Sequence, residues 1–430
     1  MHSDGKKIGL ALSGGGYRAA AYHLGTMRAL NKLGILDKID VLSSVSGGSI
    51  TAAYYVLNQS KGYEEFEREF RGKLKHGVLC TAVINLLVDI GVIIVAFGLT
   101  PTGYKWITLV VILLILFFIW YHILPVSALI ARQYDRIFFQ KAKLNELPPR
   151  PILAINTTDL STGNQFTFSQ EKMVCFPYED EYKLSFSTVG FPLSRAVMAS
   201  SCIPQIFSPV RISSKYYTGT PKKKPLLVDG GLYDNQGAHK FNSHDDYFNV
   251  SYAIVSDAGN TVMSSKWDIN PLFTLLSSAN IMMRRIKNFQ RQHNSYVPSD
   301  KKKVIFAYND LMWNDYDSMV DRFVDNIKRK YIPENVLRFH GITNEQVEDM
   351  RAGSDKAQKE IQSRIEANIN WHELLSLKPK KHDIAKKVGT NLVGLSDKKI
   401  DALIEHAEWL TEVQVRLHLP FLITEKNINL

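Results

Sequence analysis

The stretch Lys7-Ile8-Gly9-Leu10-Ala11-Leu12-Ser13-Gly14-Gly15-Gly16-Tyr17-Arg18 joins a short apolar run to three consecutive glycines. The run from Lys7 to Leu12 predicts a buried β-strand, because it is brief and ends at residues that break regular structure. The residues from Tyr17 to Leu33 are rich in Ala and Leu, and they predict a helix that Gly34 ends. This part of the chain therefore predicts a strand, a glycine turn and a helix.

The same unit then occurs a second time. Ile39 to Ser43 predicts a strand, Ser44-Val45-Ser46-Gly47-Gly48 a turn, and the residues through Leu57 a helix. Two such units in succession are typical of an α/β fold with a parallel sheet. Later apolar runs predict further strands, at Pro151 to Asn156, Leu226 to Val228 and Tyr252 to Ser256, and the chain beyond about residue 270 is predicted to be mostly helical.

The composition is that of a folded protein with a basic surface. Hydrophobic residues make up 45% and charged residues 22% of the 430 residues, which excludes a disordered chain. The formal net charge of +10 is spread over small clusters, and it suits contact with an anionic surface, either nucleic acid or the inner leaflet of a membrane. The three cysteines lie far apart without a CxxC pair, so neither a disulfide framework nor a zinc site is expected.

Two apolar segments interrupt the α/β pattern. The residues from Gly77 to Thr100 are mostly apolar, and those from Trp106 to Leu124 are almost entirely so. A membrane-spanning helix needs roughly 20 such residues, and we therefore expect a transmembrane helical hairpin over residues 77–131. Basic residues flank both ends of the pair, and the positive-inside rule places them together on the cytoplasmic side. The alternative is a pair of helices buried in a soluble core.

The hairpin is expected to be an insertion within one catalytic domain. That domain would consist of residues 1–76 and 132–260, on either side of the insertion at 77–131. A mostly helical region at 261–430 would follow and pack on the catalytic domain. The sequence contains no internal repeat and no low-complexity linker that would separate these parts.

The glycine loop from Ser13 to Arg18 could be an oxyanion hole or a phosphate cradle. Glycines let the backbone turn tightly, and the free N–H groups at a helix N-terminus favour negative charge. No Gly-Lys-Ser/Thr follows, so the loop is not a Walker loop, and its spacing does not fit a dinucleotide fingerprint. Arg18 could fix or steer the loop by its charge. A purely structural turn is the alternative.

The turn from Ser44 to Gly48 is similar to the nucleophile elbow Gly-x-Ser-x-Gly. A sharp turn between a strand and a helix exposes the hydroxyl of the middle serine, here Ser46. The neighbours, Ser44 and Gly48, must be small because the flanking backbone comes close. Ser44 stands where the first glycine of the motif usually lies.

Asp229-Gly230-Gly231 follows a predicted strand in the same way. An aspartate beside glycines at a strand end can reach a neighbouring serine and take its proton as a general base. The alternative is a turn cap. In open parallel sheets, active sites form at the carboxyl ends of the strands, and all three glycine motifs are predicted to lie there.

Together the three motifs resemble those of the patatin-like phospholipase family, and they occur in the same order. Gly14-Gly15-Gly16-Tyr17-Arg18 matches the family's glycine loop, Ser44 to Gly48 its elbow, and Asp229-Gly230-Gly231 its Asp-Gly-Gly/Ala turn. Ala199-Ser200-Ser201-Cys202-Ile203-Pro204 is similar to a further family block, Ala-Ser-x-Ala-x-Pro, and Val388 to Leu392 to the tail of bacterial members. The resemblance implies a three-layer α/β/α fold with a mainly parallel central sheet.

The resemblance also implies a serine–aspartate dyad that needs no histidine, metal or cofactor. Ser46 would attack an ester carbonyl, and Asp229 would accept its proton and later activate water. Gly14, Gly15, Gly16 and Arg18 would form the oxyanion hole, and Gly230 and Gly231 would shape the turn of the aspartate. A histidine triad is the rival arrangement. The histidines nearest to the motifs in the sequence are His23, His239 and His244.

These features together predict a phospholipase A or lysophospholipase type of enzyme. It would cleave acyl esters of membrane phospholipid or another lipid, integral to the membrane through residues 77–131, with its catalytic domain on the cytoplasmic side. Nucleic acid is not expected as a partner, and the chain could form a homo-oligomer. A membrane-anchored lipid-binding scaffold without turnover and a phosphate-binding ATPase are the alternatives. The intact Ser46 and Asp229 argue against the scaffold, and the missing loop lysine argues against the ATPase.

Overall fold

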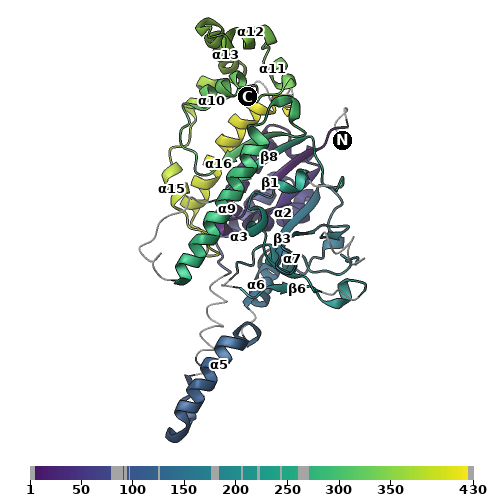
Figure 1. Ribbon diagram of the computed structural model, residues 1–430, viewed down its shortest axis with the longest axis vertical. Helices are drawn as coiled ribbons and strands as arrows, with labels where there is room; N and C mark the ends of the chain where they lie inside the picture. Colours follow the sequence, from purple (N-terminus) through teal and green to yellow (C-terminus); the bar gives the residue numbers. More distant parts are fainter. Residues whose placement is uncertain are drawn as a thin grey trace.

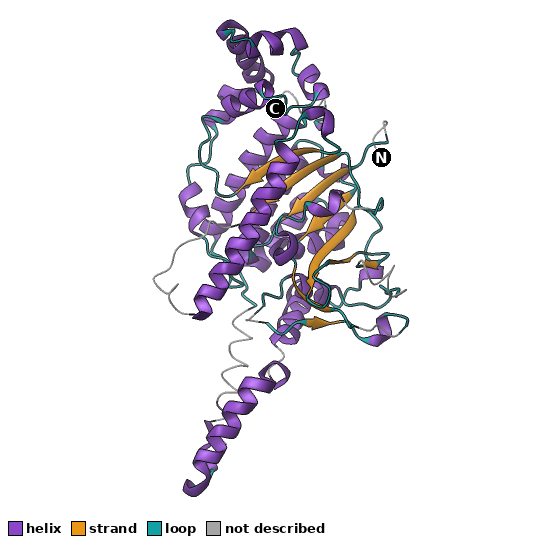
Figure 2. Ribbon diagram, in the orientation of Figure 1, coloured by secondary structure: helices purple, strands orange, loops and turns teal. Residues whose placement is uncertain are grey.

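The centre of the molecule is a mixed β-sheet with the strand order β5-β4-β3-β2-β1-β8-β9 (Figure 2). A computed structural model describes residues 5–78, 91, 94–95, 97–123, 126–175, 184–204, 207–219, 223–242, 245–259 and 271–424. The strands in these residues are β1 Ile8–Leu12, β2 Val41–Ser44, β3 Ile152–Asp159, β4 Gln165–Phe168, β5 Met173–Val174, β6 Val210–Arg211, β7 Leu226–Asp229, β8 Tyr252–Asp257 and β9 Ile305–Asp310.

The predicted α/β fold is confirmed. The five strands β3, β2, β1, β8 and β9 are parallel to one another. Strands β4, β5, β6 and β7 extend the sheet beyond β3 by antiparallel pairing. The expectation of a mainly parallel sheet therefore holds for the centre, and the whole sheet is mixed. Every residue of β1, Ile-Gly-Leu-Ala-Leu, is buried, as its unbroken apolar run predicted.

The helices cover the sheet and extend the molecule at both ends (Figure 1). In the described residues they are α1 Gly16–Lys32, α2 Gly47–Asn58, α3 Tyr63–Leu74, α5 Lys105–Ile123, α6 Val126–Tyr134, α7 Leu193–Ser200, α8 Gly231–Asp234, α9 Pro271–Ser295, α10 Met319–Lys328, α11 Glu334–Phe339, α12 Asn344–Arg351, α13 Asp355–Asn368, α14 Trp371–Ser376, α15 His382–Lys387 and α16 Asp397–His418. Helix α1 is buried along almost its whole length because it packs against both α2 and α16. A Cβ at Gly25 would lie 2.2 Å from the carbonyl oxygen of Ile404, so a glycine permits the close crossing of α1 and α16.

The prediction of a mostly helical region after residue 270 overlooked one strand. Strand β9 pairs with β8 as an edge of the parallel sheet, and α16 packs on α1, so this region supplies elements to the central domain. Helices α10 to α14 share a second apolar core with part of α16. In β9, Phe306 to Asp310 are all buried, so the strand lacks the alternation of apolar and polar residues that marks a half-exposed one.

One helix lies outside the body of the molecule. Helix α5 projects from one end (Figure 1), and several large apolar side chains in its first half are solvent-exposed, with exposed fractions of 78% for Trp106, 61% for Ile107 and 56% for Leu113. Most of the first segment of the expected transmembrane hairpin, including residues 79–90, lies outside the described residues. In the described part of the chain, no helix combines the length and the apolar character that crossing a membrane requires.

Candidate active site

Ser46 lies in a strained turn between β2 and α2. Its backbone has φ 50° and ψ −118°, a positive φ that residues other than glycine rarely adopt. Backbone strain of this kind persists only where the surrounding structure holds it in place, and it gathers at functional sites. The structure therefore gives Ser46 the sharp strand-to-helix turn that its sequence motif predicted.

The glycines of the loop and the elbow allow the two backbones to touch. A Cβ at Gly47 would lie 2.1 Å from the carbonyl oxygen of Gly16, and a Cβ at Gly48 would lie 2.3 Å from that of Leu12. A Cβ at Gly14 would come within 3.2 Å of the Ser46 Cβ. Two motifs separated by thirty residues in the sequence thus share one site, and only residues without a side chain fit at the contact.

Asp229 reaches this site from the opposite direction. Strand β7 is antiparallel to β3, with Asp229 opposite Thr157, so its carboxyl end does not belong to the parallel set of strand ends. The expectation that all three motifs end parallel strands was wrong for this one. β3 continues past its pairing with β2 and carries β7 with it, which brings Asp229 to the same edge. A Cβ at Gly230 would lie 2.3 Å from the carbonyl oxygen of Asn156, so this turn also needs a glycine.

The Asp229 carboxylate is buried and accepts a hydrogen bond from the Gly231 N–H, at 2.7 Å from Oδ1. Burial raises the pKa of Asp229 to about 6, although the Gly231 N–H and the nearby Ser46 hydroxyl both act to lower it. The structure therefore brings the predicted serine and aspartate close together, with a carboxylate that is more basic than a free one.

The glycine loop contains two backbone N–H groups that make no hydrogen bond in the described structure, those of Gly15 and Gly16. Gly15 and Gly16 have φ values of 147° and 60°, which L-residues with side chains rarely adopt. In the described structure, neither of these two N–H groups has a hydrogen-bond acceptor. The Gly14 N–H does have one, because it donates to the carbonyl oxygen of Asn235 at 3.0 Å. Gly14 was expected to belong to the oxyanion hole, and its bond to Asn235 removes it as a donor.

Arg18 holds the glycine loop in place through hydrogen bonds to backbone carbonyl groups that are distant in the sequence. Its Nε and Nη2 donate to the carbonyl oxygen of Ala258 at 3.1 and 2.7 Å, and its Nη1 donates to that of Val388 at 3.3 Å. Burial lowers the pKa of Arg18 to about 10, against the attraction of Asp257. The guanidinium was expected in the oxyanion hole. Its donors instead join the loop to the end of β8 and to the C-terminal segment.

Residues 10–241, more than half of the chain, match the patatin-like phospholipase family. The chain belongs to this family. It is therefore an ester hydrolase, and membership supports activity on lipid acyl groups. Comparison with curated protein sequences gives no match.

Two solved proteins are similar to this family member at low identity. VipD from Legionella pneumophila is 12% identical over 94% of this chain and 91% of its own, with a TM-score of 0.30. Human GIVD cytosolic phospholipase A2 is 12% identical over 99% of this chain and 62% of its own, with a TM-score of 0.48. The complex of the human enzyme with methyl gamma-linolenyl fluorophosphonate is 14% identical over 99% and 58%, with a TM-score of 0.46.

Ser44, which stands where the family usually has glycine, is accommodated by hydrogen bonds. Its side chain is fully buried, and its hydroxyl donates to the carbonyl oxygen of Ala154 at 3.2 Å. The Ser44 Oγ also accepts a hydrogen bond from the Ser49 hydroxyl, at 3.2 Å. A buried hydroxyl is costly only when it lacks partners, and this one has two. The departure from the motif thus leaves the elbow turn intact.

Ser200 is a site residue whose role the sequence motifs did not indicate. Its hydroxyl accepts a hydrogen bond from the Ser46 N–H at 2.9 Å and donates to the carbonyl oxygen of Asn156 at 2.6 Å. Its own carbonyl oxygen accepts the Gly230 N–H at 3.2 Å. One residue at the end of α7 therefore contacts the backbone at both members of the serine–aspartate pair. The signal in the sequence was the block from Ala199 to Pro204, which resembles the family but carries no predicted role.

The histidines that could form a triad have other partners. The buried His23 ring contacts the Ser256 hydroxyl at 2.8 Å and the Ser13 carbonyl oxygen at 2.9 Å, and burial lowers its pKa to about 4. The exposed His239 ring lies against Tyr233. His244 lies outside the described residues. Among the histidines that are described, none hydrogen-bonds to Ser46 or Asp229.

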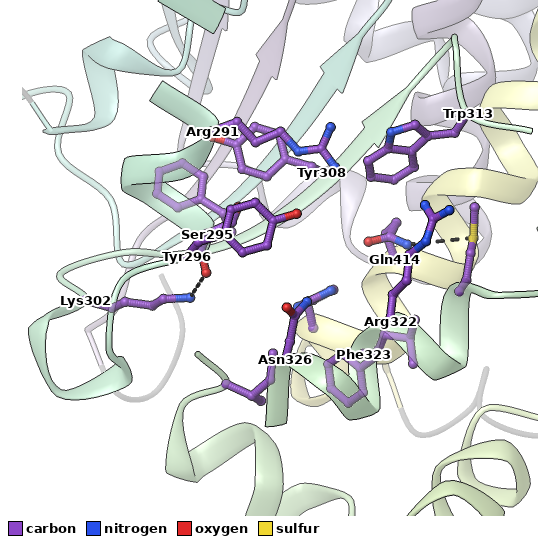
Figure 3. A pocket seen from close by; sticks show the side chains of 15 residues that line it. Arg291, Ser295, Tyr296, Lys302, Tyr308, Trp313, Arg322, Phe323, Asn326 and Gln414 are labelled. Carbon is purple, nitrogen blue, oxygen red and sulfur yellow. Dashed lines mark hydrogen bonds between the residues drawn. The ribbon is translucent and has the colours of Figure 1, made fainter. Parts of the chain in front are cut away.

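A separate cavity of about 110 Å³ lies away from these motifs, at the carboxyl end of α9. Figure 3 shows Arg291, Tyr308 and Trp313 on one side of it and Arg322 and Asn326 on the other. None of the motif residues lines this cavity. It is therefore not the place where Ser46 would meet a substrate.

Proposed function

We propose that the chain is a serine lipid acyl hydrolase of the phospholipase A or lysophospholipase type, with Ser46 and Asp229 as its catalytic dyad. The observation that carries this proposal is that the hydroxyl of a strained, elbow-held serine lies close enough to a buried carboxylate to lower its pKa. Nucleophile and base within hydrogen-bond reach are the signature of covalent catalysis by serine. Family membership supports an acyl ester of a lipid as the substrate.

In the first half of the reaction, the Ser46 Oγ attacks the ester carbonyl carbon while Asp229 takes the hydroxyl proton. The carbonyl oxygen becomes an oxyanion, and the free N–H groups of Gly15 and Gly16 would donate to it. Donors of this kind contribute about 3–4 kcal/mol each in serine hydrolases. The tetrahedral intermediate then collapses, and the bond to the leaving alcohol breaks. The protonated Asp229 gives its proton to that alcohol, which departs and leaves an acyl-enzyme.

In the second half, Asp229 takes a proton from water, and the resulting hydroxide attacks the acyl carbon. The new intermediate collapses with release of the fatty acid, and Ser46 regains its proton from Asp229. A base with a pKa near 6 is suited to both halves, because it is ionised at neutral pH and still accepts a proton more readily than an ordinary aspartate. The burial of Asp229 is therefore part of the proposed chemistry.

The projecting helix α5 supports a membrane location for this enzyme. Contiguous exposed apolar residues mark contact with a membrane or a partner, and α5 exposes Trp106, Ile107, Val110 and Leu113. We propose that residues 77–131 are integral to the membrane and hold the catalytic domain on its cytoplasmic side. That domain consists of residues 1–76 and 132–260, and β9 and α16 from the region 261–430 complete it. Helix α6, which follows α5, packs on α7, the helix that ends at Ser200.

The decisive experiment incubates the purified protein with mixed lipids and identifies the released fatty acids by mass spectrometry. Wild-type protein should release them, and Ser46→Ala and Asp229→Asn should each reduce the rate by about 10⁴-fold or more, as in other serine hydrolases. Ser201→Ala is the matched control, since the Ser201 hydroxyl bonds to the Val197 carbonyl oxygen and should be dispensable. Full hydrolysis by Asp229→Asn would refute the dyad. Labelling of Ser46 by a fluorophosphonate probe separates an enzyme from a lipid-binding scaffold.

A further inference from the structure

Helix α9 exposes three large apolar side chains. The exposed fractions are 55% for Ile281, 66% for Met282 and 70% for Phe289, and no described side chain of this 25-residue helix is buried in the core. A surface helix of a globular protein normally turns its apolar stripe inward. Ile281, Arg285 and Phe289 follow one another at intervals of four residues, so they lie on a single face of the helix.

Polar contacts hold the inner side of α9 to the sheet. The Lys287 ammonium lies 2.9 Å from a carboxylate oxygen of Asp257 and 2.9 Å from one of Asp310, which end β8 and β9. The Arg291 guanidinium lies over the Trp313 ring, 4.5 Å from its centroid, and Figure 3 shows the two side chains on the same side of the cavity. Ionic and stacking contacts therefore fix α9, and its exposed apolar residues are not needed for that purpose.

All the formally charged residues of α9 are basic. Its sequence contains Arg284, Arg285, Lys287 and Arg291 but no aspartate or glutamate. Lys287 and Arg291 face carboxylates, whereas Arg284 and Arg285 are exposed and form no ion pair in the described structure. A face that combines exposed apolar residues with unpaired arginines matches the interfacial region of an anionic bilayer, where acyl chains lie beneath charged headgroups.

The position of α9 fits such a contact. Its amino-terminal end lies at the end of the body from which α5 projects (Figure 1), so one bilayer could touch both elements. Helix α9 also packs against α8, which begins two residues after Asp229. A membrane that touched the outer face of α9 would therefore lie close to the proposed site.

We infer that the outer face of α9, formed by Ile281, Met282, Arg285 and Phe289 and flanked by the exposed Arg284, docks on the surface of an anionic phospholipid bilayer. The inference rests on the proposed function for its purpose, which is to bring substrate to Ser46, and it adds a preference for anionic lipid. The docking face is distinct from α5, because apolar α5 should favour zwitterionic and anionic bilayers alike.

The test measures binding without turnover, in full-length Ser46→Ala protein. Affinity is compared for phosphatidylcholine vesicles with and without phosphatidylglycerol, by flotation. Each arginine at a charged surface contributes about a fivefold gain, so Arg284→Gln with Arg285→Gln should lower the preference for anionic vesicles by about thirtyfold. The matched control is Lys356→Gln with Lys359→Gln, which removes the same charge from the exposed face of α13 at the far end of the molecule (Figure 1).

A second measurement keeps the test decisive if α5 alone retains the protein on every vesicle. A polarity-sensitive fluorophore on Phe289→Cys, in a Cys80→Ala background, should shift to bluer emission with anionic vesicles, and one on Lys359→Cys should not. Equal preference in the arginine variant and its control, or no shift at residue 289, would overturn the docking face. Hydrolysis of a soluble ester by the wild-type Ser46 enzyme is assayed separately. Its absence would refute the proposed function and leave the binding result standing.

Discussion

At the scale of single residues, Asp229 as the proposed base would combine catalytic fitness with a cost in stability. Burial raises the pKa of its carboxyl from 3.8 to about 6, although the Gly231 N–H and the Ser46 hydroxyl act to lower it. The base acts only when it is ionised. We therefore expect kcat/KM for a soluble ester to rise with pH, level off above about 6, and fall about tenfold per pH unit below it. A profile that stays flat between pH 4 and 8 would contradict Asp229 as the base.

The same shift predicts how stability depends on pH. The folded state binds the Asp229 proton more tightly than the unfolded state, so this residue reduces the free energy of unfolding as pH rises from about 4 to about 6. At pH 7 the cost is roughly 3 kcal/mol. Asp229→Asn should therefore be inactive yet more stable than wild type at pH 7, and this gain should vanish near pH 4. Urea unfolding at both pH values checks the result, and equal stability at pH 7 would refute it.

Ser200 should act as a positioning residue for the elbow. Ser200→Ala leaves the buried Ser46 N–H without its acceptor, which costs about 1–3 kcal/mol. The strained turn would then relax, and kcat should fall about tenfold or more while KM and the pH profile of Asp229 stay near wild type. Ser201→Ala is the matched control, because its hydroxyl bonds to the Val197 carbonyl oxygen and the Tyr134 hydroxyl and not to the backbone of Ser46 or Gly230. A variant that loses stability but keeps full kcat would assign Ser200 to packing alone.

At the scale of elements, the contact between α9 and the sheet depends on one lysine. Burial alone would raise the pKa of Asp257, and the Lys287 ammonium together with Gln236 outweighs burial and lowers it. Lys287→Met leaves Asp257 and Asp310 without this cation and should cost about 3–5 kcal/mol. Because a carboxylate with a lowered pKa stabilises the fold above its unfolded pKa, the loss should be largest near pH 8 and shrink on acidification. Denaturant unfolding of Lys287→Met, with the exposed Lys303→Met as control, measures this. Equal stability of the two variants would show that the ion cluster does not hold α9.

At the scale of the whole molecule, the body and the projecting helix should be separable. Val78 is buried before the apolar insertion, and Ser127 and Ile130 are buried after it, so the anchoring residues on both sides belong to the body. Replacing residues 79–125 by a short Gly-Ser linker should leave soluble-ester hydrolysis within a few-fold of wild type. The shortened protein should leave the membrane fraction after a salt wash that removes electrostatic contacts, whereas wild type should remain. A shortened protein that resists the salt wash would refute the anchoring role of this segment.

The local order of strand, turn and helix could be predicted from the sequence, because glycine breaks and apolar runs act over a few residues. The same local signals indicated Ser44, Ser46, Gly48 and Asp229 as candidate site residues. The prediction overlooked β9, whose burial hides the alternation that marks a half-exposed strand. It also placed β7 with the parallel strands, since nothing in Leu226 to Asp229 tells which way the strand runs beside β3.

The sequence by itself determined the α/β class and the elbow turn at Ser46, because both depend on short-range backbone preferences and on residue type; it offered Asp229 as a candidate partner through the resemblance to the family. Only the tertiary structure decided which groups are free to act. The Gly14 N–H donates to the carbonyl oxygen of Asn235, and the Arg18 guanidinium donates to that of Ala258. The Ser200 hydroxyl accepts a hydrogen bond from the Ser46 N–H. These outcomes depend on contacts between residues tens to hundreds of positions apart, and chain packing sets such contacts because every buried donor and acceptor must find a partner.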